Sequence, residues 1–249
     1  MSQMQAPSAA ASPSALPLTG QDRGARVREM FGRIVPRYDL MNRLMTGGMD
    51  GEWRRLTAMA ALPLGSVVLD LATGTGDLAL ELRALGARRV VAADFCAPML
   101  DAARVKLRER RVSGIDLALA DAMALPFANG SFDSVTSGFL LRNVADLPRA
   151  LAEMRRVLRP GGRAVSLEIT HLRSGPLATV FNSYFKHVVP AVGGFISGDR
   201  VAYQYLPASV DAFPDADHLS RLFKEAGFAS VSYRTVGFGS LAIHAARRA

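Results

Sequence analysis

The 249-residue sequence has few cysteines, aromatic residues and histidines, and each shortage argues against a class of protein. Its one cysteine, Cys96, excludes a disulfide framework and a zinc site built from cysteines, which fits a cytoplasmic location. Aromatic residues make up 7% of the chain, so its basic segments offer few rings on which bases could stack. The four histidines are scattered without metal-ligand spacing. We therefore expect neither a nucleic-acid partner nor a metal.

Acidic residues are also in short supply. The chain has 22 Asp and Glu against 30 Lys and Arg, which gives a net charge of +8. Such a surface attracts anionic partners, and anionic lipid headgroups are the remaining candidate. An unspecific solubilising surface explains the charge equally well.

No apolar stretch is long and uninterrupted enough to predict a membrane-spanning helix. The most apolar segment, 175–198, is broken by Asn182, Lys186, His187 and Pro190. A covered substrate pocket or an interfacial helix fits this segment better. Residues 1–22 are rich in Ala, Pro and Ser and lack both a basic start and an apolar core, so we expect a disordered tail.

The full sequence is 49% hydrophobic, which is enough for residues 23–249 to form one compact domain. From residue 65 onward, strand-like apolar runs alternate with helical patterns, which is typical of a doubly wound parallel α/β sheet. The expected strands are 66–72, 89–94, 115–121, 132–141, 164–169, 230–238 and 241–248, and the expected helices are 78–85, 98–110, 147–158 and 218–228, with a turn at 159–163. Two segments stand outside this alternation: an N-terminal helical cap at 24–64 and an apolar insertion at 171–213.

A glycine turn, "DLATGTGD", follows the first expected strand. Gly74 and Gly76 let a ligand approach the backbone and the next helix, so we expect a nucleotide-like cofactor. The spacing of these glycines also satisfies the dinucleotide pattern, so the motif alone favours NAD equally. Asp70 and Asp77 flank the turn, and carboxylates repel a pyrophosphate but attract the ammonium and sulfonium of S-adenosylmethionine. Asp77 alone is equally explained as a partner of the helix dipole.

Two more aspartates end the next expected strands. Asp94 stands where an acid accepts hydrogen bonds from ribose hydroxyls, with a helix cap as the alternative. Asp121 is suited to accept from the exocyclic amine of adenine, with a turn residue as the alternative. Beyond the fourth strand, the apolar run of "GFLLRNV" stops at Arg142 and Asn143.

These motifs resemble the class I S-adenosylmethionine-dependent methyltransferases, because "LDLATGTGD", Asp94, "ADAMALPFANGSFDSV" and "VLRPGGR" occur in that family's order. Further segments of the chain indicate a narrower family. The segments "YDLMNRLMTGG", "GEWRR", "LLRNVADLPRALAEMRRVL" and "YQYLPASVDAFPDADHLSRLFKEAGF" look like the C-methyltransferases of menaquinone and ubiquinone biosynthesis. This likeness covers roughly residues 24–248. It implies a Rossmann-like sheet of seven strands, mostly parallel, with an antiparallel last strand.

The resemblance also implies the cofactor contacts. Thr75 and the backbone of Gly74 and Gly76 would bind the methionine part of S-adenosylmethionine, Asp94 the ribose, and Asp121 with Ala122 the adenine. Asp70 remains an attractive partner for the positive charge. Two positions depart from the family pattern: Thr73 stands where a glycine is common, and Gly138 where a serine is common, so a side-chain contact is lost there.

The expected reaction is C-methylation of a prenylated quinol, demethylmenaquinol to menaquinol. A ubiquinone-precursor benzoquinol, or O- or N-methylation of another small aromatic, is the alternative. Arg142 would polarise a water or the hydroquinolate and Asn143 would fix the ring, whereas a salt bridge is the alternative for Arg142. Tyr38 would approach the same oxygen, unless it is a core aromatic. Intact Tyr38, Arg142 and Asn143 argue against a binding protein without turnover. Further acid-base candidates are Glu168, His171 and His187.

The isoprenoid tail of such a substrate needs an apolar groove. Met41, Met45, Phe181 and Phe185 are expected to line it, with an ordinary core role as the equal alternative. The basic surface would then dock the protein at the inner face of the cell membrane, by peripheral contact with anionic lipid. A homodimer is left open.

Overall fold

The computed structural model describes residues 23–61, 64–172 and 200–249, with single positions 175, 179, 183, 184 and 188 between them. The predicted tail at 1–22 lies outside the described residues. The same holds for most of the apolar insertion, including the predicted pocket residues Phe181 and Phe185 and the acid-base candidate His187.

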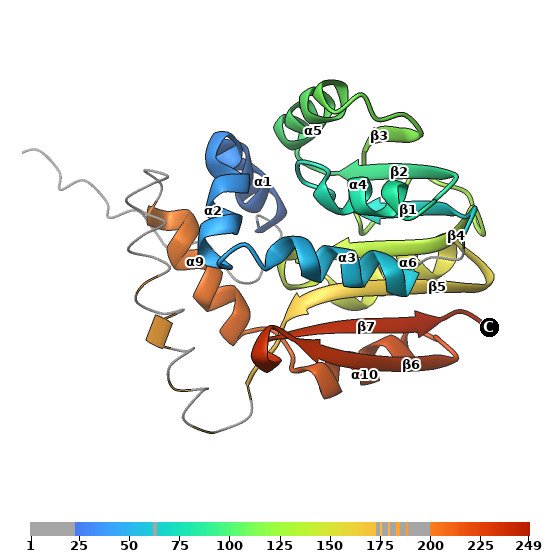
Figure 1. Cartoon of the computed structure of the whole chain (residues 1–249). Helices are drawn as coiled ribbons and strands as arrows, with labels where there is room; N and C mark the ends of the chain where they lie inside the picture. Colours follow the sequence, from blue (N-terminus) through green and yellow to red (C-terminus); the bar gives the residue numbers. More distant parts are fainter. Residues whose placement is uncertain are drawn as a thin grey trace, which may run out of the picture.

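A seven-stranded sheet forms the centre of the molecule, in the order β3-β2-β1-β4-β5-β7-β6 (Figure 1). The strands are β1 (Val67–Leu71), β2 (Arg89–Asp94), β3 (Ile115–Leu119), β4 (Phe132–Gly138), β5 (Leu158–Ile169), β6 (Ser230–Val236) and β7 (Leu241–Arg247). The first five pair in parallel, whereas β7 is antiparallel to both β5 and β6. This confirms the predicted fold class.

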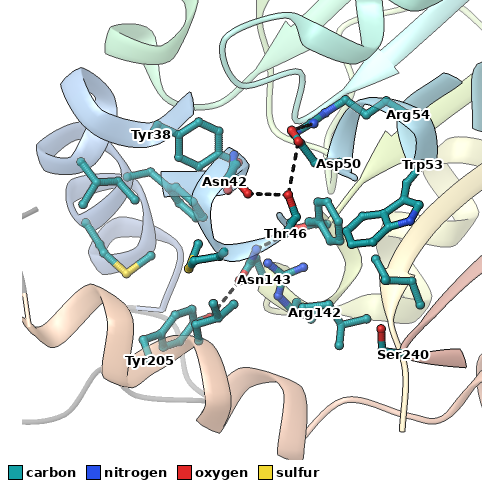
Figure 2. Close-up of a pocket in the computed structure, with 18 of the residues that line it drawn as sticks. Tyr38, Asn42, Thr46, Asp50, Trp53, Arg54, Arg142, Asn143, Tyr205 and Ser240 are labelled. Atoms are coloured by element: carbon teal, nitrogen blue, oxygen red, sulfur yellow. Dashed lines mark hydrogen bonds and ion pairs between the residues drawn. The ribbon is translucent and has the colours of Figure 1, made fainter. Parts of the chain in front are cut away.

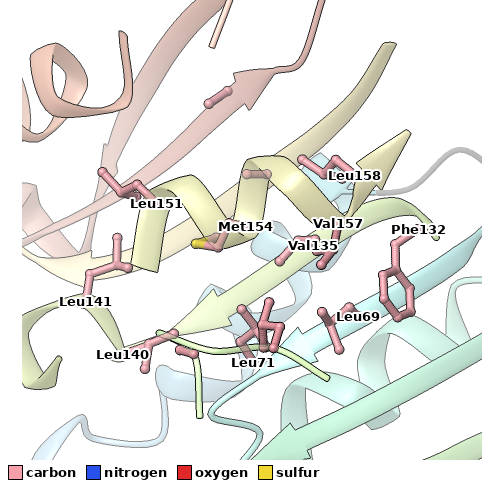
Figure 3. Packing of buried hydrophobic residues seen from close by; sticks show 14 of the residues in the cluster. Leu69, Leu71, Phe132, Val135, Leu140, Leu141, Leu151, Met154, Val157 and Leu158 are labelled. Atoms are coloured by element: carbon pink, nitrogen blue, oxygen red, sulfur yellow. The ribbon is translucent and has the colours of Figure 1, made fainter. Parts of the chain in front are cut away.

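The two faces of the sheet are covered by different helices, as the alternation of side chains along a strand requires. Leu69 and Leu71 face α6 (Leu147–Val157) and α10 (Ala216–Glu225), in the cluster drawn in Figure 3. Val68, the residue before Leu69, faces α3 (Asp50–Ala61) and α4 (Asp77–Ala84) on the opposite side. Helix α5 (Ala97–Glu109) follows β2 and packs against β2 and β3.

Three helices gather beyond the carboxyl ends of the parallel strands (Figure 1) and are called the cap here: α1 (Arg23–Ile34), α2 (Tyr38–Met45) and α9 (Arg200–Asp211). Their buried side chains form a separate apolar cluster that includes Met30, Met41 and Tyr205. Helix α3, which the sequence assigns to the cap, packs on the sheet through Trp53, Ala58 and Ala61 instead. A 3-10 turn, η1 (Val35–Arg37), joins α1 to α2.

Two expected boundaries differ from the structure. The turn predicted at 159–163 lies within β5, as an irregularity where the register with β4 shifts. Gly162 permits this, because a Cβ there would lie 2.9 Å from the carbonyl oxygens of Arg159 and Asp133. The fourth strand ends at Gly138, since Phe139 takes a positive φ of 61°, and a short 3-10 turn, η2 (Leu141–Asn143), follows.

Candidate active site

Three cavities adjoin where the cap meets the carboxyl ends of the strands. The loop cavity, of about 260 Å³, is lined by residues that include Gly74, Asp94, Phe95, Met99, Asp121, Ala122 and Leu140. The apolar cavity, of about 150 Å³, is lined by residues that include Met30, Phe31, Met45, Trp53, Arg142, Ile169, Tyr184, Tyr205 and Leu206. The polar cavity is smaller and includes Arg54, Asp70, Thr73, Thr75 and Asp77. Tyr38 and Phe139 line all three, so they mark the junction.

The glycine turn exposes bare backbone to the loop cavity. Gly74 and Gly76 have φ values of 57° and 89°, which side-chain-bearing residues rarely adopt. A Cβ on Gly74 would lie 3.6 Å from the Tyr38 ring. Strand β1 ends directly before this turn, and the strand order reverses between β1 and β4, which is where open α/β sheets bind ligands.

Asp94, at the end of β2, is hydrogen-bonded to the backbone of the glycine turn. Its carboxylate accepts hydrogen bonds from the backbone N–H of Gly74, at 2.8 Å, and of Cys96, at 2.9 Å. Burial raises the pKa of Asp94, although these hydrogen bonds oppose the rise. The side chain also lines the loop cavity, so its remaining acceptor positions suit the hydroxyls of a ribose.

Asp121 and Ala122 line the other end of the loop cavity. The Asp121 carboxylate accepts from the backbone N–H of Met123 at 2.9 Å, so the turn role considered from the sequence is present. With apolar Phe95 and Met99 nearby, the donor and acceptor set of this cavity fits an adenosine. The contacts of each residue with a cofactor remain predictions.

Asp70 is fully buried beneath the polar cavity. Thr73 and Thr136 donate hydrogen bonds to its two oxygens at 2.7 and 2.8 Å. Burial raises the pKa of Asp70 to about 7, since those hydrogen bonds only partly stabilise the ionised form. Thr73, where the family commonly has a glycine, thus binds Asp70 and leaves the turn intact.

A lysine that sequence reasoning missed connects α5 to the glycine turn and to the cap. Lys106 Nζ lies 2.7 Å from Asp77, 2.6 Å from Asp39 and 2.9 Å from the Thr75 hydroxyl. The Thr75 hydroxyl in turn donates to Asp39 at 2.6 Å. Asp77 is therefore ion-paired, whereas the sequence argument treated it as free to attract a cationic ligand. No local pattern marks Lys106, because its partners come from distant segments.

Arg142, in η2, forms the salt bridge that was its alternative role. Its Nη1 lies 3.2 Å from Glu168 Oε2, and only 8% and 1% of the two side chains are exposed. The Leu141 N–H donates to the other Glu168 oxygen at 2.6 Å. Burial raises the pKa of Glu168 to about 7 even though Arg142 opposes the rise.

The same guanidinium also lines the apolar cavity. It lies over the Phe139 ring, with 5.3 Å from its carbon to the ring centroid. Its Nε is buried and has no hydrogen-bond partner among the described residues. Arg142 therefore has one side of its guanidinium in an ion pair and a donor that is not used. It can still donate a hydrogen bond to a further acceptor.

Asn143 and Tyr38 complete the junction (Figure 2). The Asn143 amide donates to the Phe139 carbonyl at 2.9 Å and accepts from the Tyr205 hydroxyl at 3.3 Å. Burial raises the pKa of Tyr38, so its hydroxyl stays protonated at neutral pH. The structure thus brings the predicted catalytic residues Tyr38, Arg142 and Asn143 to one place, although their roles stay predictions.

Of the two predicted substrate-pocket methionines, one lines the apolar cavity and the other does not. Met45 lines the apolar cavity, whereas Met41 is 1% exposed and belongs to the core of the cap. Trp53 and Tyr205, which sequence reasoning missed, supply aromatic walls. His171 donates to or accepts from the Phe213 carbonyl at 3.0 Å, depending on its tautomer, and lines none of the three cavities.

Two findings on the described residues bear on other classes of site. No group of three or more His, Cys, Asp or Glu side chains in this part of the chain could hold a metal ion. No helix there is both long and apolar enough to cross a membrane.

The sheet order, the glycine turn after β1 and the acid that ends β2 define a class I S-adenosylmethionine-dependent methyltransferase. Solved structures share this fold. A methyltransferase of Thermotoga maritima superposes with a TM-score of 0.64 at 19% identity, over 89% of this chain and 99% of its own. A methyltransferase of Aquifex aeolicus gives 0.60 at 18% identity, over 86% and 95%.

The sequence comparisons are more specific. The model of the ubiE/COQ5 methyltransferase family matches residues 20–248, and the chain belongs to that family. The demethylmenaquinone methyltransferase of Thermus thermophilus is 50% identical over 222 residues, covering 88% of this chain and 100% of the relative. That of Deinococcus radiodurans is 47% identical, over 88% and 91%. The ubiquinone/menaquinone biosynthesis C-methyltransferase of Desulfotalea psychrophila is 43% identical, over 89% and 90%. The predicted family and cofactor are confirmed.

Proposed function

We propose that this enzyme methylates a ring carbon of a prenylated quinol, and that demethylmenaquinol is the substrate. The observation that carries the proposal is the junction at Tyr38 and Phe139, where the loop cavity meets an apolar cavity. A methyl donor in one cavity would face an aromatic ring in the other. Relatives that align over nearly their whole length and are named demethylmenaquinone methyltransferases support the choice of substrate.

The residues of the loop and polar cavities are suited to hold S-adenosylmethionine. Asp94 would accept from the ribose, Asp121 and Ala122 would contact the adenine, and the turn at Gly74, Thr75 and Gly76 would contact the methionine part, with Asp70 beneath it. When bound, the cofactor supplies an electrophilic methyl group.

The chain's own residues must make the ring carbon nucleophilic. Deprotonating a quinol oxygen raises electron density on the adjacent carbon, so the site has to stabilise an oxyanion. Arg142 suits this task, since its guanidinium stays charged and lines a cavity with mainly apolar walls. It cannot act as the base itself. Asn143 and the protonated Tyr38 hydroxyl would hold the ring and its oxygen in place.

Glu168 determines whether the charge of Arg142 is balanced by an ion pair. With a pKa of about 7, its carboxyl is partly protonated near neutral pH, and a proton on it frees Arg142 from its ion pair. The substrate oxyanion can then balance the charge of Arg142. Glu168 is a positioning residue in this scheme, because it lines none of the three cavities.

The apolar tail of the quinol would follow the apolar cavity along Met45, Trp53 and Leu206. Phe181 and Phe185 remain predictions for the same groove. The relative from Desulfotalea psychrophila is named for both ubiquinone and menaquinone, so a benzoquinol substrate is the second candidate.

The cellular quinones distinguish these substrates. After deletion of the gene, mass spectrometry of the lipid extract should show a quinone that lacks one methyl group, and its ring and tail would identify the substrate. A restored wild-type gene should remove it. An unchanged quinone profile would contradict the proposal.

The proposal extends to peripheral contact with an anionic membrane at the inner face of the cell. Leu40 and Leu44 lie one turn apart on α2 and are 53% and 51% exposed, and exposed Arg37 and Arg43 accompany them. Apolar side chains flanked by arginines favour the interface of an anionic bilayer. This face belongs to the same helix that contributes Tyr38 and Met45 to the apolar cavity.

Sedimentation with lipid vesicles tests this contact. Replacing Leu40 and Leu44 by serine should weaken binding to phosphatidylglycerol vesicles, and neutral phosphatidylcholine vesicles should bind little. Serine at Val105 and Leu119, which are similarly exposed on α5 and β3, is the matched control. Equal vesicle binding by all variants would contradict the proposed membrane contact.

Light scattering of the same samples measures the molar mass in solution and decides whether the chain forms a homodimer, which the sequence leaves open.

A further inference from the structure

Arg54 is a cation that neither the glycine turn nor the proposed quinol chemistry uses. It lies on α3, only 11% of its side chain is exposed, and it lines both the polar cavity beside the glycine turn and the apolar cavity. Its neighbour Arg55 is exposed and lines none of the three cavities. A buried guanidinium needs an acceptor to offset the loss of water, so its surroundings indicate what it binds.

One nitrogen of the Arg54 guanidinium is already hydrogen-bonded within α3. Its Nη1 donates to Asp50 one turn earlier on α3, and Asp50 in turn accepts from the Thr46 hydroxyl at 3.3 Å (Figure 2). Among the described residues, Asp50 is the one side chain that Arg54 hydrogen-bonds. A guanidinium has five N–H donors, so others remain for a ligand, and the Asp50 contact fixes the direction of the fork.

The polar cavity carries both signs of charge. Besides Arg54, its described lining includes the carboxyl groups of Asp70 and Asp77, and both interact electrostatically with Arg54. An α-amino acid group is a zwitterion, with a carboxylate and an ammonium on one carbon. The cavity also shares Tyr38, Ala72, Gly138 and Phe139 with the loop cavity, so a ligand in the loop cavity can extend into it.

We propose that Arg54 binds the carboxylate of the methionine moiety of S-adenosylmethionine, and that Asp70 beside it attracts the ammonium. The inference rests on the cofactor placement proposed above. It gives α3 a role in cofactor binding, and it makes Asp50 a positioning residue for Arg54.

Calorimetric titration of the full chain without quinol tests this assignment. The two probes are S-adenosylmethionine and decarboxylated S-adenosylmethionine, which differ in the carboxylate alone. Arg54→Ala should weaken binding of the first by about 10- to 100-fold, the range for a hydrogen bond to a charged group. Binding of the decarboxylated probe should stay within about twofold, which also shows that the variant is folded. Arg55→Ala is the matched control and should bind both probes like the wild type.

The other outcomes are equally decisive. An unchanged preference for the carboxylated probe in Arg54→Ala would overturn the assignment, as would an equal loss for both probes. A variant that binds both probes normally but loses affinity for quinol would place Arg54 against the substrate instead. If Arg54→Ala fails to fold, Arg54→Lys decides, because loss of the fork should still reduce the preference by about fivefold or more. Failure of the wild type to bind either probe would contradict the cofactor placement itself.

Discussion

Arg142 is held by an ion pair and a ring, yet it still lines the apolar cavity. The contact with Glu168 and the position over Phe139 restrict its guanidinium to one orientation. A charge fixed in surroundings of low dielectric acts more strongly on a developing oxyanion than the same charge in water. The salt bridge and the catalytic role, which the sequence presents as alternatives, are therefore compatible.

Replacing Arg142 by alanine should lower kcat for the quinol by at least about a hundredfold, the scale for losing an oxyanion donor. Affinity for S-adenosylhomocysteine should stay nearly unchanged, because Arg142 does not line the loop cavity. Single-turnover rates and calorimetry measure the two effects. Arg221→Ala, an exposed change on α10, is the control. A near-normal turnover in Arg142→Ala would exclude the proposed role.

A cluster of charged side chains joins the cap to the helices that follow β1 and β2. Lys106 on α5 binds Asp39 on α2 and Asp77 at the start of α4, and Thr75 of the glycine turn joins them. Burial of Asp39 raises its pKa, but the hydrogen bonds from Lys106 and Thr75 outweigh burial, so the pKa falls below the usual range. The cluster links the helix that carries Tyr38 to the turn that is expected to contact the cofactor.

Replacing Lys106 by alanine should loosen α2 and leave the sheet unchanged. Amide hydrogen exchange in α2 should become faster by about three- to tenfold, in keeping with the loss of one partly exposed ion-pair network. Mass spectrometry of deuterium uptake measures this, with exposed Lys224→Ala on α10 as the control. Equal protection of α2 in both variants would mean that Lys106 does not hold the cap.

Much of this element structure could be predicted from the sequence. The periodic runs of β1 to β4 and the glycine turn act through neighbouring residues, so the sequence predicts these strands to within three residues of their observed ends, and Asp94 at its observed place. Strand β5 begins six residues before its expected start, because the expected turn lies within it. Lys106 and Arg54 were missed, because their partners lie on other elements and meet them only through packing. The left-handed Phe139 was missed for a related reason, since nothing local indicates that an aromatic residue takes this conformation.

For the whole molecule, two buried carboxyl groups make stability depend on pH. Burial raises the pKa of Asp70 from 3.8 and that of Glu168 from 4.5, each to about 7. The unfolded chain therefore loses these protons at lower pH than the folded chain does. The contribution of these two groups to the free energy of unfolding should fall as pH rises from about 4 to about 7 and then level off, whereas the lowered pKa of buried His244 acts in the opposite direction.

Glu168→Gln tests this dependence, because glutamine keeps a neutral side chain at every pH. Thermal unfolding between pH 4 and 8 should show a smaller fall in Tm for the variant than for the wild type. The remaining slope should come from Asp70 and from Asp94, whose pKa values burial also raises. Glu225→Gln, an exposed change on α10, should keep the wild-type slope. A slope unaltered by Glu168→Gln would mean that folding does not raise the pKa of Glu168.

The reaction proposed for this enzyme transfers a methyl group to a ring carbon of a reduced prenylated naphthoquinone. The most direct measurement incubates the purified enzyme with demethylmenaquinol, kept reduced, and S-adenosylmethionine that carries a ¹³C methyl group. The proposal predicts one labelled methyl per quinone, and ¹³C NMR should place it on the ring carbon. A label on oxygen, or no transfer to the quinol, would contradict it.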